Sequence, residues 1–166
     1  MKKMKKIMAL MLAAIMMMAM SVTTFAAETT RSLTVNAKGG QDLKGQTINL
    51  YKLFDVTESG EAPNKNYAYT VNTQYKATLA SVLGIGADSK DEEFAAKVTE
   101  LGKDNSTEVQ NFANTFTTKA LESKLAVTAT SGKITKDSNK TSYTFDNLTA
   151  GYYLVYVTGG KEIQSS

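Results

Sequence analysis

The chain has 166 residues, of which 19 are basic and 16 acidic, and it contains no Cys, His or Trp. The absence of Cys excludes a disulfide scaffold, a zinc ribbon and a cysteine nucleophile, and the absence of His excludes triads and metal sites built on imidazole. Composition therefore removes most familiar enzyme chemistry, and we expect no catalytic residues, no metal and no cofactor.

The N-terminal segment has the composition of an export signal. All eight Met fall within the first twenty residues, where four Lys precede an uninterrupted apolar run over residues 7–20. Small residues then surround the junction of Ala26 and Ala27, so we predict a signal peptide over residues 1–26 that is cleaved after Ala26. The alternative is a retained membrane anchor, but this apolar run would span only about 21 Å as a helix, less than a hydrocarbon core of about 30 Å.

Removal of the leader changes the charge of the protein. The remaining 140 residues hold fifteen basic and sixteen acidic side chains, for a net charge of −1. Their lysines are scattered singly, so we expect no nucleic-acid surface and no membrane contact beyond the signal peptide during export. A domain of this length can bury about two-thirds of its unfolded surface, which is enough for a core without disulfides.

The first part of the predicted mature chain, residues 27–166, has the alternation of β-strands. A short strand is predicted at Leu33–Val35, a longer one over residues 45–56 and another at Tyr67–Val71. The side chains expected on one face of the longer strand are Ile48, Leu50, Lys52 and Phe54.

The hydrophobic period becomes helical over about residues 74–121. The pattern predicts three amphipathic helices, the first of which ends at Gly84, a residue suited to a left-handed C-cap. The apolar residues expected to face the core are Tyr75, Leu79, Val82, Leu83, Phe94, Ala95, Val98, Leu101, Val109, Phe112, Ala113, Phe116 and Ala120.

Alternation returns after residue 124, with strands predicted at Leu125–Ala129, Lys140–Phe145 and Gly151–Thr158 and a polar hairpin region between the first two. The last strand is apolar on both faces, which is typical of a strand inside a sheet that is covered on both sides. Strands, three helices and strands again predict one α+β domain, mainly β, with the architecture of a β-sandwich carrying a helical excursion.

The segment Tyr143–Val155, with sequence YTFDNLTAGYYLV, resembles the strand–turn–strand motif of Cna-B-like domains. The segment Leu43–Val56, with sequence LKGQTINLYKLFDV, is similar to the early strand of the N-terminal domain in SpaA-type major pilins of Gram-positive bacteria. The likeness covers nearly all of residues 31–158. It implies an Ig-like or Cna-B-like sandwich in a structural, adhesive shaft subunit that is secreted, polymerised by a pilus sortase and attached to the cell wall.

The resemblance implies other pilin subunits and the sortase as partners, with host extracellular matrix as a further one. The sequence has no Tyr-Pro-Lys-Asn-type motif and no Leu-Pro-x-Thr-Gly sorting signal, so we expect it to be a fragment of a longer polypeptide. Two alternatives remain open. One is a standalone secreted adhesin or ligand-binding module of the same fold, and the other is a secreted hydrolase built on paired carboxylates.

Relatives of this kind also form internal isopeptide bonds, in which a buried neutral lysine attacks an asparagine carboxamide while a carboxyl group moves the proton. The family's lysine and glutamate positions correspond approximately to Ala37 and Val157, which cannot do this chemistry. Lys52 is the remaining candidate lysine, and its alternative role is a lysine at a sheet edge whose stem packs on apolar neighbours. We predict no internal isopeptide bond in residues 27–166.

Overall fold

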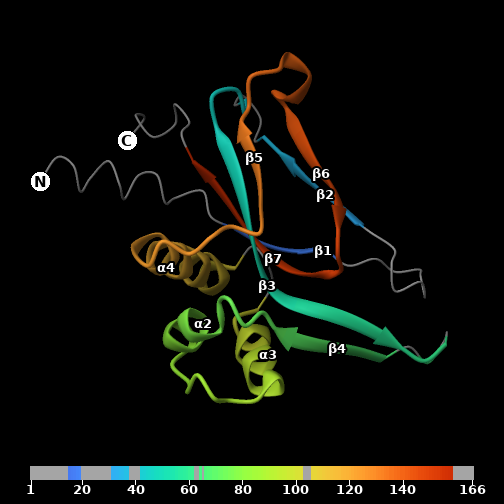
Figure 1. Cartoon of the computed structure of the whole chain (residues 1–166), viewed down its shortest axis with the longest axis vertical. Coiled ribbons are helices and arrows are strands. Elements are labelled where there is room, and N and C mark those ends of the chain that lie inside the picture. The colour runs from blue at the N-terminus through green and yellow to red at the C-terminus, as the bar shows by residue number, and fades with distance from the viewer. Residues whose placement is uncertain are drawn as a thin grey trace, which may run out of the picture.

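The computed structural model describes residues 15–19, 31–37, 42–61, 64, 66–102 and 106–158. These residues form three layers, with a five-stranded antiparallel sheet between a group of helices and a two-stranded antiparallel sheet (Figure 1). The prediction of a mixed α+β fold with two packed sheets and three helices is confirmed for this part of the chain.

The large sheet is built around two central strands, β3 (Thr47–Ser59) and β7 (Gly151–Thr158). The outer edge of β7 pairs with β1 (Ile15–Ala19). The opposite edge of β3 pairs first with β5 (Ala129–Lys133) and then, further along, with β4 (Asn66–Val71). The long second half of β3 and its partner β4 extend away from the rest of the domain as a two-stranded arm (Figure 1).

A β-bulge interrupts β3 near its middle. The register of β3 with β7 shifts by one residue between Lys52 and Phe54, and an extra residue in one strand reverses the side-chain alternation beyond it. Phe54 therefore packs in the core beneath the helices, whereas Ile48 and Leu50 pack in the core on the other face of the sheet. The predicted common face of these residues is wrong beyond Lys52.

The small sheet consists of β2 (Arg31–Asn36) and β6 (Ser142–Leu148), which follows the short 3₁₀ helix η2 (Asp137–Asn139). It covers the second face of the large sheet. The buried residues between the two sheets are Leu33, Val35, Leu43, Ile48, Leu50, Ile134, Phe145, Leu148, Tyr153 and Val155. Because β6 and β7 belong to different sheets, the turn that joins them is a corner of the fold.

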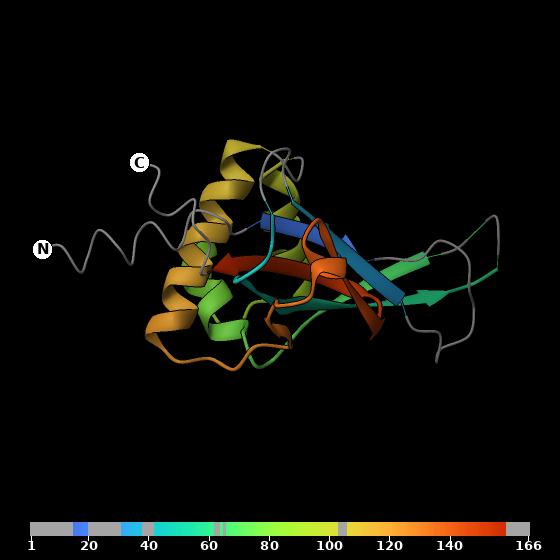
Figure 2. The same ribbon diagram turned by 90° about the horizontal axis from the view of Figure 1, so that it is seen from above.

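Three helices lie between β4 and β5 in sequence, where the helical excursion was predicted. They are α2 (Lys76–Leu83), α3 (Asp91–Glu100) and α4 (Thr107–Glu122). Figure 2 shows them grouped on one side of the strands. The C-cap of α2 is Gly84, as predicted, with a φ of 74°, and the N-cap of α4 is Ser106, whose hydroxyl accepts the N–H of Val109 at 3.2 Å.

The core beneath the helices is rich in aromatic residues. Tyr51 from β3 lies edge-on to Tyr75 and to Phe116 of α4, with ring centroids 5.5 Å apart in both pairs. The hydroxyl of Tyr75 donates to the carbonyl of Ala126 at 2.6 Å. The strand β7 is buried on both faces, as predicted, with every residue from Tyr152 to Tyr156 at most 6% exposed.

Alkaline pH should destabilise this core. Burial raises the pKa of Tyr51 from 10.0 to about 12, and it also raises the pKa values of Tyr75 and Tyr153. An unfolded chain releases these protons near pH 10, so the stability from neutral tyrosines is complete below that pH and is lost as the pH rises through the folded-state pKa. We expect Tyr51 to account for a loss of about 2 kcal/mol in the free energy of unfolding.

Urea unfolding across this pH range measures the effect, with Tyr51→Phe as the control variant in which the decline should be shallower. Phenolate absorbance reports the titration directly. Ionisation of every tyrosine near pH 10 without unfolding would contradict the prediction.

The segment predicted as a strand at Leu125–Ala129 is mostly not one, since β5 begins only at Ala129. The N–H of Leu125 instead bonds the carbonyl of Ala120 at the end of α4, at 2.9 Å, and the N–H of Thr128 bonds the carbonyl of Leu50 at 2.7 Å. The end of α4 thus takes up the N–H of Leu125, and only the end of the segment bonds to β3. The predicted hairpin between this segment and β6 is also wrong, because β5 and β6 lie in different sheets.

The hydroxyl of Thr117 on α4 is fully buried and has no hydrogen-bond partner among the described residues. An unsatisfied buried hydroxyl is destabilising, and Val has nearly the same shape and helix propensity as Thr. We therefore expect Thr117→Val to raise the free energy of unfolding by about 1 kcal/mol in urea titrations. Thr117→Ser, which keeps the hydroxyl and loses the methyl group, should be destabilising. A less stable Val variant would show that the hydroxyl is satisfied.

The predicted signal peptide contains one described element, the strand β1, which lies against β7 in the uncleaved chain. Ala26 and Ala27 lie outside the described residues, and cleavage between them stays a prediction. Within the described ranges, none of the helices has the length and apolar character needed to cross a bilayer.

Candidate functional site

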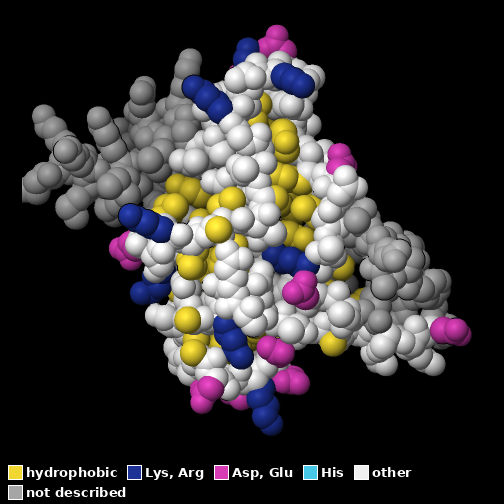
Figure 3. All heavy atoms as spheres, in the orientation of Figure 1, with side chains coloured by type: hydrophobic (Ala, Val, Ile, Leu, Met, Phe, Trp, Pro, Cys, Tyr) yellow, Lys and Arg dark blue, Asp and Glu magenta, His cyan; other side chains and the backbone are white. Residues whose placement is uncertain are grey.

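Charged side chains are scattered over the described part of the face drawn in Figure 3. On the face drawn in Figure 3, hydrophobic side chains form a band between isolated basic and acidic ones. In the described part of the chain no group of three or more Asp or Glu is placed to hold a metal ion. Lys52 is the one charged residue classed as buried among those described, at 6% exposure, and it directs attention to the middle of β3.

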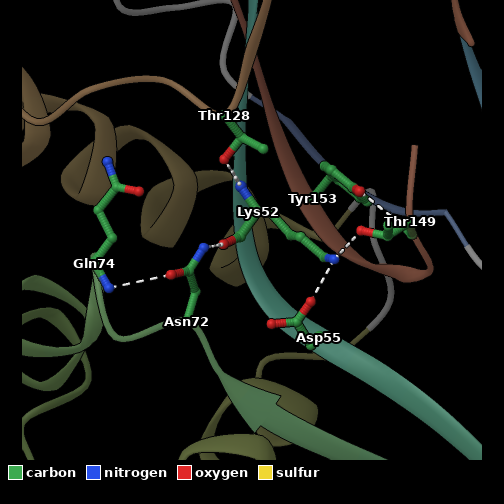
Figure 4. A network of polar contacts seen from close by, with 7 residues as sticks. All are labelled: Lys52, Asp55, Asn72, Gln74, Thr128, Thr149 and Tyr153. Atoms are coloured by element: carbon green, nitrogen blue, oxygen red, sulfur yellow. Dashed lines mark hydrogen bonds and ion pairs between the residues drawn. The ribbon is translucent and has the colours of Figure 1, made fainter. Parts of the chain in front are cut away.

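The amine of Lys52 has three partners. Nζ forms an ion pair with the carboxylate of Asp55 and donates to the hydroxyl Oγ1 of Thr149, and it lies 5.9 Å from the centre of the Tyr153 ring (Figure 4). Residues three apart on a regular strand point to opposite faces. The bulge between Lys52 and Phe54 supplies the extra residue that brings Asp55 to the same side as Lys52.

The backbone of Lys52 is held as firmly as its side chain. Its N–H donates to Oγ1 of Thr128 at 2.8 Å, and its carbonyl accepts from Nδ2 of Asn72 at 2.9 Å. Asn72 is fixed in turn by the backbone N–H of Gln74, which donates to its Oδ1 at 3.1 Å (Figure 4). These contacts occupy the gap on the edge of β3 between its two partners β5 and β4.

The stem of Lys52 crosses the start of β7. A Cβ added to Gly151 would lie 2.4 Å from Cε of Lys52 and 2.5 Å from the backbone oxygen of Phe54, so glycine is needed for the two strands to approach this closely. The hydroxyl of Tyr153 also donates to the carbonyl of Thr149 at 2.6 Å. Lys52, Asp55, Thr149, Gly151 and Tyr153 together form what we call the corner staple, which fastens β3 to the turn between β6 and β7.

The corner staple is built to hold two strands together. The side chain of Asp55 is 51% exposed, so water reaches its carboxylate, whereas the side chain of Lys52 is only 8% exposed. The partners described for Nζ do not include an asparagine carboxamide. Lys52 pairs with β7 on one side of β3 and lies at the gap between β5 and β4 on the other, and its stem packs over Gly151.

The absence of an internal isopeptide bond stays a prediction, and mass spectrometry tests it. The intact mass of residues 27–166 should equal the sequence mass, because an ion pair loses no atoms. A deficit equal to one ammonia or one water would contradict the prediction. Lys52→Arg is the matched control, since it keeps the charge and cannot form the same amide.

An apolar cavity of about 210 Å³ opens between α3 and the large sheet. Three aromatic side chains form its inner wall, and the ring of Phe54 is 6.4 Å from that of Tyr69 and 6.1 Å from that of Tyr152. The other lining residues are Ala95, Val98, Thr99 and Gly102. A more polar hollow of about 430 Å³ lies among the helices.

Sequence patterns indicated Lys52, and they indicated the segment that contains Thr149, Gly151 and Tyr153, but not that this segment contacts Lys52. Asp55 and Thr149 are ordinary polar residues of an exported chain, and their contact with Lys52 depends on the bulge and on the corner. Comparisons of the chain with protein-family models, with curated proteins and with solved structures found no match.

Proposed function

We propose that the protein is a structural subunit of a sortase-assembled pilus on the surface of a Gram-positive cell. The observation that carries this proposal is the corner staple. The segment Tyr143–Val155, which resembles the Cna-B-like motif, forms the corner between the sheets, and the buried charge at Lys52 fastens that corner. The most elaborate polar arrangement described therefore serves cohesion between strands, which is what a load-bearing subunit requires.

The layered architecture supports an Ig-like, Cna-B-like interpretation. Antiparallel strands on both sides of one core are typical of sandwiches, and the three helices interrupt the strand order in a single excursion. In this proposal the subunit is exported by its signal peptide, joined to other pilin subunits by a pilus sortase and anchored to the cell wall, with adhesion to host matrix as the outcome.

Immunoblots of cell-wall extracts test the proposal. The complete coding sequence is expressed with its pilus sortase, and antibodies are raised against residues 27–158. A ladder of species that resists boiling in detergent is expected, because sortase links are covalent. The control strain carries a sortase without its nucleophile and should give monomer only. Monomer alone in both strains would overturn the proposal.

The cavity beside α3 favours a second candidate function, that of a secreted adhesin or ligand-binding module. A concave apolar site with aromatic walls suits an apolar side chain of a matrix protein. Binding of immobilised matrix proteins to residues 27–166 tests it. Ala95→Phe fills the cavity and should abolish binding, whereas Glu92→Ala, an exposed change on the same helix, should not. Binding that ignores both changes would exclude this site.

A further inference from the structure

The outer edge of β4 is an open strand edge on the two-stranded arm. β4 is the last strand in the order of the large sheet, and no other described helix or strand runs along its outer side in Figure 1. Tyr67, near the start of the strand, is one of the few large apolar residues described as exposed, at 39%. Because the arm extends away from the rest of the domain, another strand could approach this edge without meeting the helices or the small sheet.

Two residues supply the open backbone groups of this edge. The N–H of Asn72 donates to a carbonyl of β3 at 2.9 Å. Because backbone groups alternate in direction along a strand, those of Tyr67, Tyr69 and Val71 point away from β3. The carboxylate of Asp91 already accepts the N–H of Val71 at 3.2 Å. The open part of the edge therefore ends at Asp91, and its outward groups belong to Tyr67 and Tyr69.

β4 lacks the features that keep natural edge strands from pairing. Its sequence is NYAYTV, which contains no Pro, no Lys and no other charged residue, whereas protected edges carry such residues. Pairing across a two-fold axis brings a strand against its own sequence, and an uncharged strand then meets no like charge. The composition of β4 therefore suits a second copy of the chain as its partner.

We propose that two copies of the protein associate through their β4 strands, antiparallel across a two-fold axis at Ala68. In this register Tyr67 lies opposite Tyr69 of the second copy, and these pairs exchange their outward N–H and C=O groups. A shift in one direction would require the N–H of Val71, which Asp91 holds. A shift in the other direction would carry Tyr69 past the end of β4 in the second copy.

The side chains of β4 agree with this register. Tyr67 and Tyr69 share one face of the strand, so the tyrosines of the two copies lie side by side, and cross-strand aromatic pairs stabilise an antiparallel ladder. On the other face, Ala68 meets its own copy, and Asn66 meets Thr70. Such a short ladder is small compared with the roughly 1,600 Å² that a stable complex buries, so we expect a weak association that depends on concentration.

Disulfide trapping tests the proposal because the chain has no cysteine of its own. In the whole chain, Ala68→Cys places the thiols of two copies at a non-hydrogen-bonded pair on the axis, where Cα atoms are about 4.5 Å apart and within disulfide reach. Most molecules should become disulfide-linked dimers under mild oxidation. Thr70→Cys is the matched control, because Thr70 is also exposed but lies far from its own copy, and it should form dimers about tenfold more slowly.

A mixture of the Asn66→Cys and Thr70→Cys proteins tests the register. It should yield mainly the mixed dimer, which intact mass distinguishes from the two homodimers. Tyr67→Pro, added to Ala68→Cys, removes an outward N–H and keeps the ladder with β3, so it should lower the dimer yield about tenfold while the urea midpoint stays nearly the same.

This association does not depend on the proposed pilus function, since it needs only the edge of β4. A protein with Ala68→Cys that stays monomeric would overturn the proposal. Equal dimer formation by Ala68→Cys and Thr70→Cys would overturn it as well, as would homodimers in place of the mixed dimer or a dimer yield that Tyr67→Pro leaves unchanged.

Discussion

Gly151→Ala should destabilise the domain by about 3 kcal/mol or more, because the added methyl group has no room between the strands. The new Cβ would lie 2.4 Å from Cε of Lys52 and 2.5 Å from the carbonyl oxygen of Phe54. The lysine stem could rotate away, but the backbone oxygen belongs to the central strand of the sheet. β3 and β7 would have to separate at the corner.

The urea midpoint of residues 27–166 measures this loss. Gly132→Ala is the matched control, because a Cβ there meets nothing within 4 Å although φ is 63°, and we expect it to cost about 1 kcal/mol. The double variant Gly151→Ala with Lys52→Ala lacks the clash with the lysine stem but keeps the clash with the carbonyl oxygen of Phe54. It should therefore be hardly more stable than Gly151→Ala alone. Full recovery would show that the lysine, and not the backbone of Phe54, makes glycine necessary.

Asp55→Ala should destabilise the domain by about 3 kcal/mol, because it leaves the buried Lys52 amine without its counter-charge. Lys52→Met should cost about 1 kcal/mol or less. Met keeps the apolar stem over Gly151, and the half-exposed carboxylate of Asp55 turns to water. The two partners of one ion pair are thus expected to differ in their effects, since only one of them is buried.

The double variant with Lys52→Met and Asp55→Ala should be about as stable as Lys52→Met alone, and the difference from additivity gives the coupling energy. Urea unfolding at neutral pH measures all four proteins. Glu92→Ala, an exposed acidic residue on α3, controls for a general effect of charge removal. Equal losses for the two single variants would mean that the pair contributes no more than an exposed surface ion pair.

Local sequence patterns predicted most of the helices and strands whose apolar side chains recur at a regular spacing. The apolar positions of the helices, the left-handed end of α2 at Gly84 and the two-sided burial of β7 follow from spacing and residue type, because each depends on neighbours within a few residues. Lys52 was identified from its face of the strand by the same reasoning, and it remains on the face of Ile48 and Leu50.

Features that depend on distant segments could not be predicted in this way. The bulge after Lys52 occurs where β3 changes partners from β5 to β4, and no local signal at Leu53 or Phe54 announces it. The position of Asp55 beside Lys52 follows from that bulge. The pairing of β1 likewise depends on the edge that β7 offers, since an apolar run of Met, Ile and Ala has no period of its own.

The two cores share the same pair of strands, which has a consequence for cooperativity. On β7, Leu154 enters the core beneath the helices and its neighbour Val155 enters the core between the sheets; Tyr51 and Leu50 divide in the same way on β3. Neither core can melt without releasing the backbone that the other requires. The helical layer and the small sheet, although they do not form one continuous core, are therefore thermodynamically coupled and should unfold in one transition.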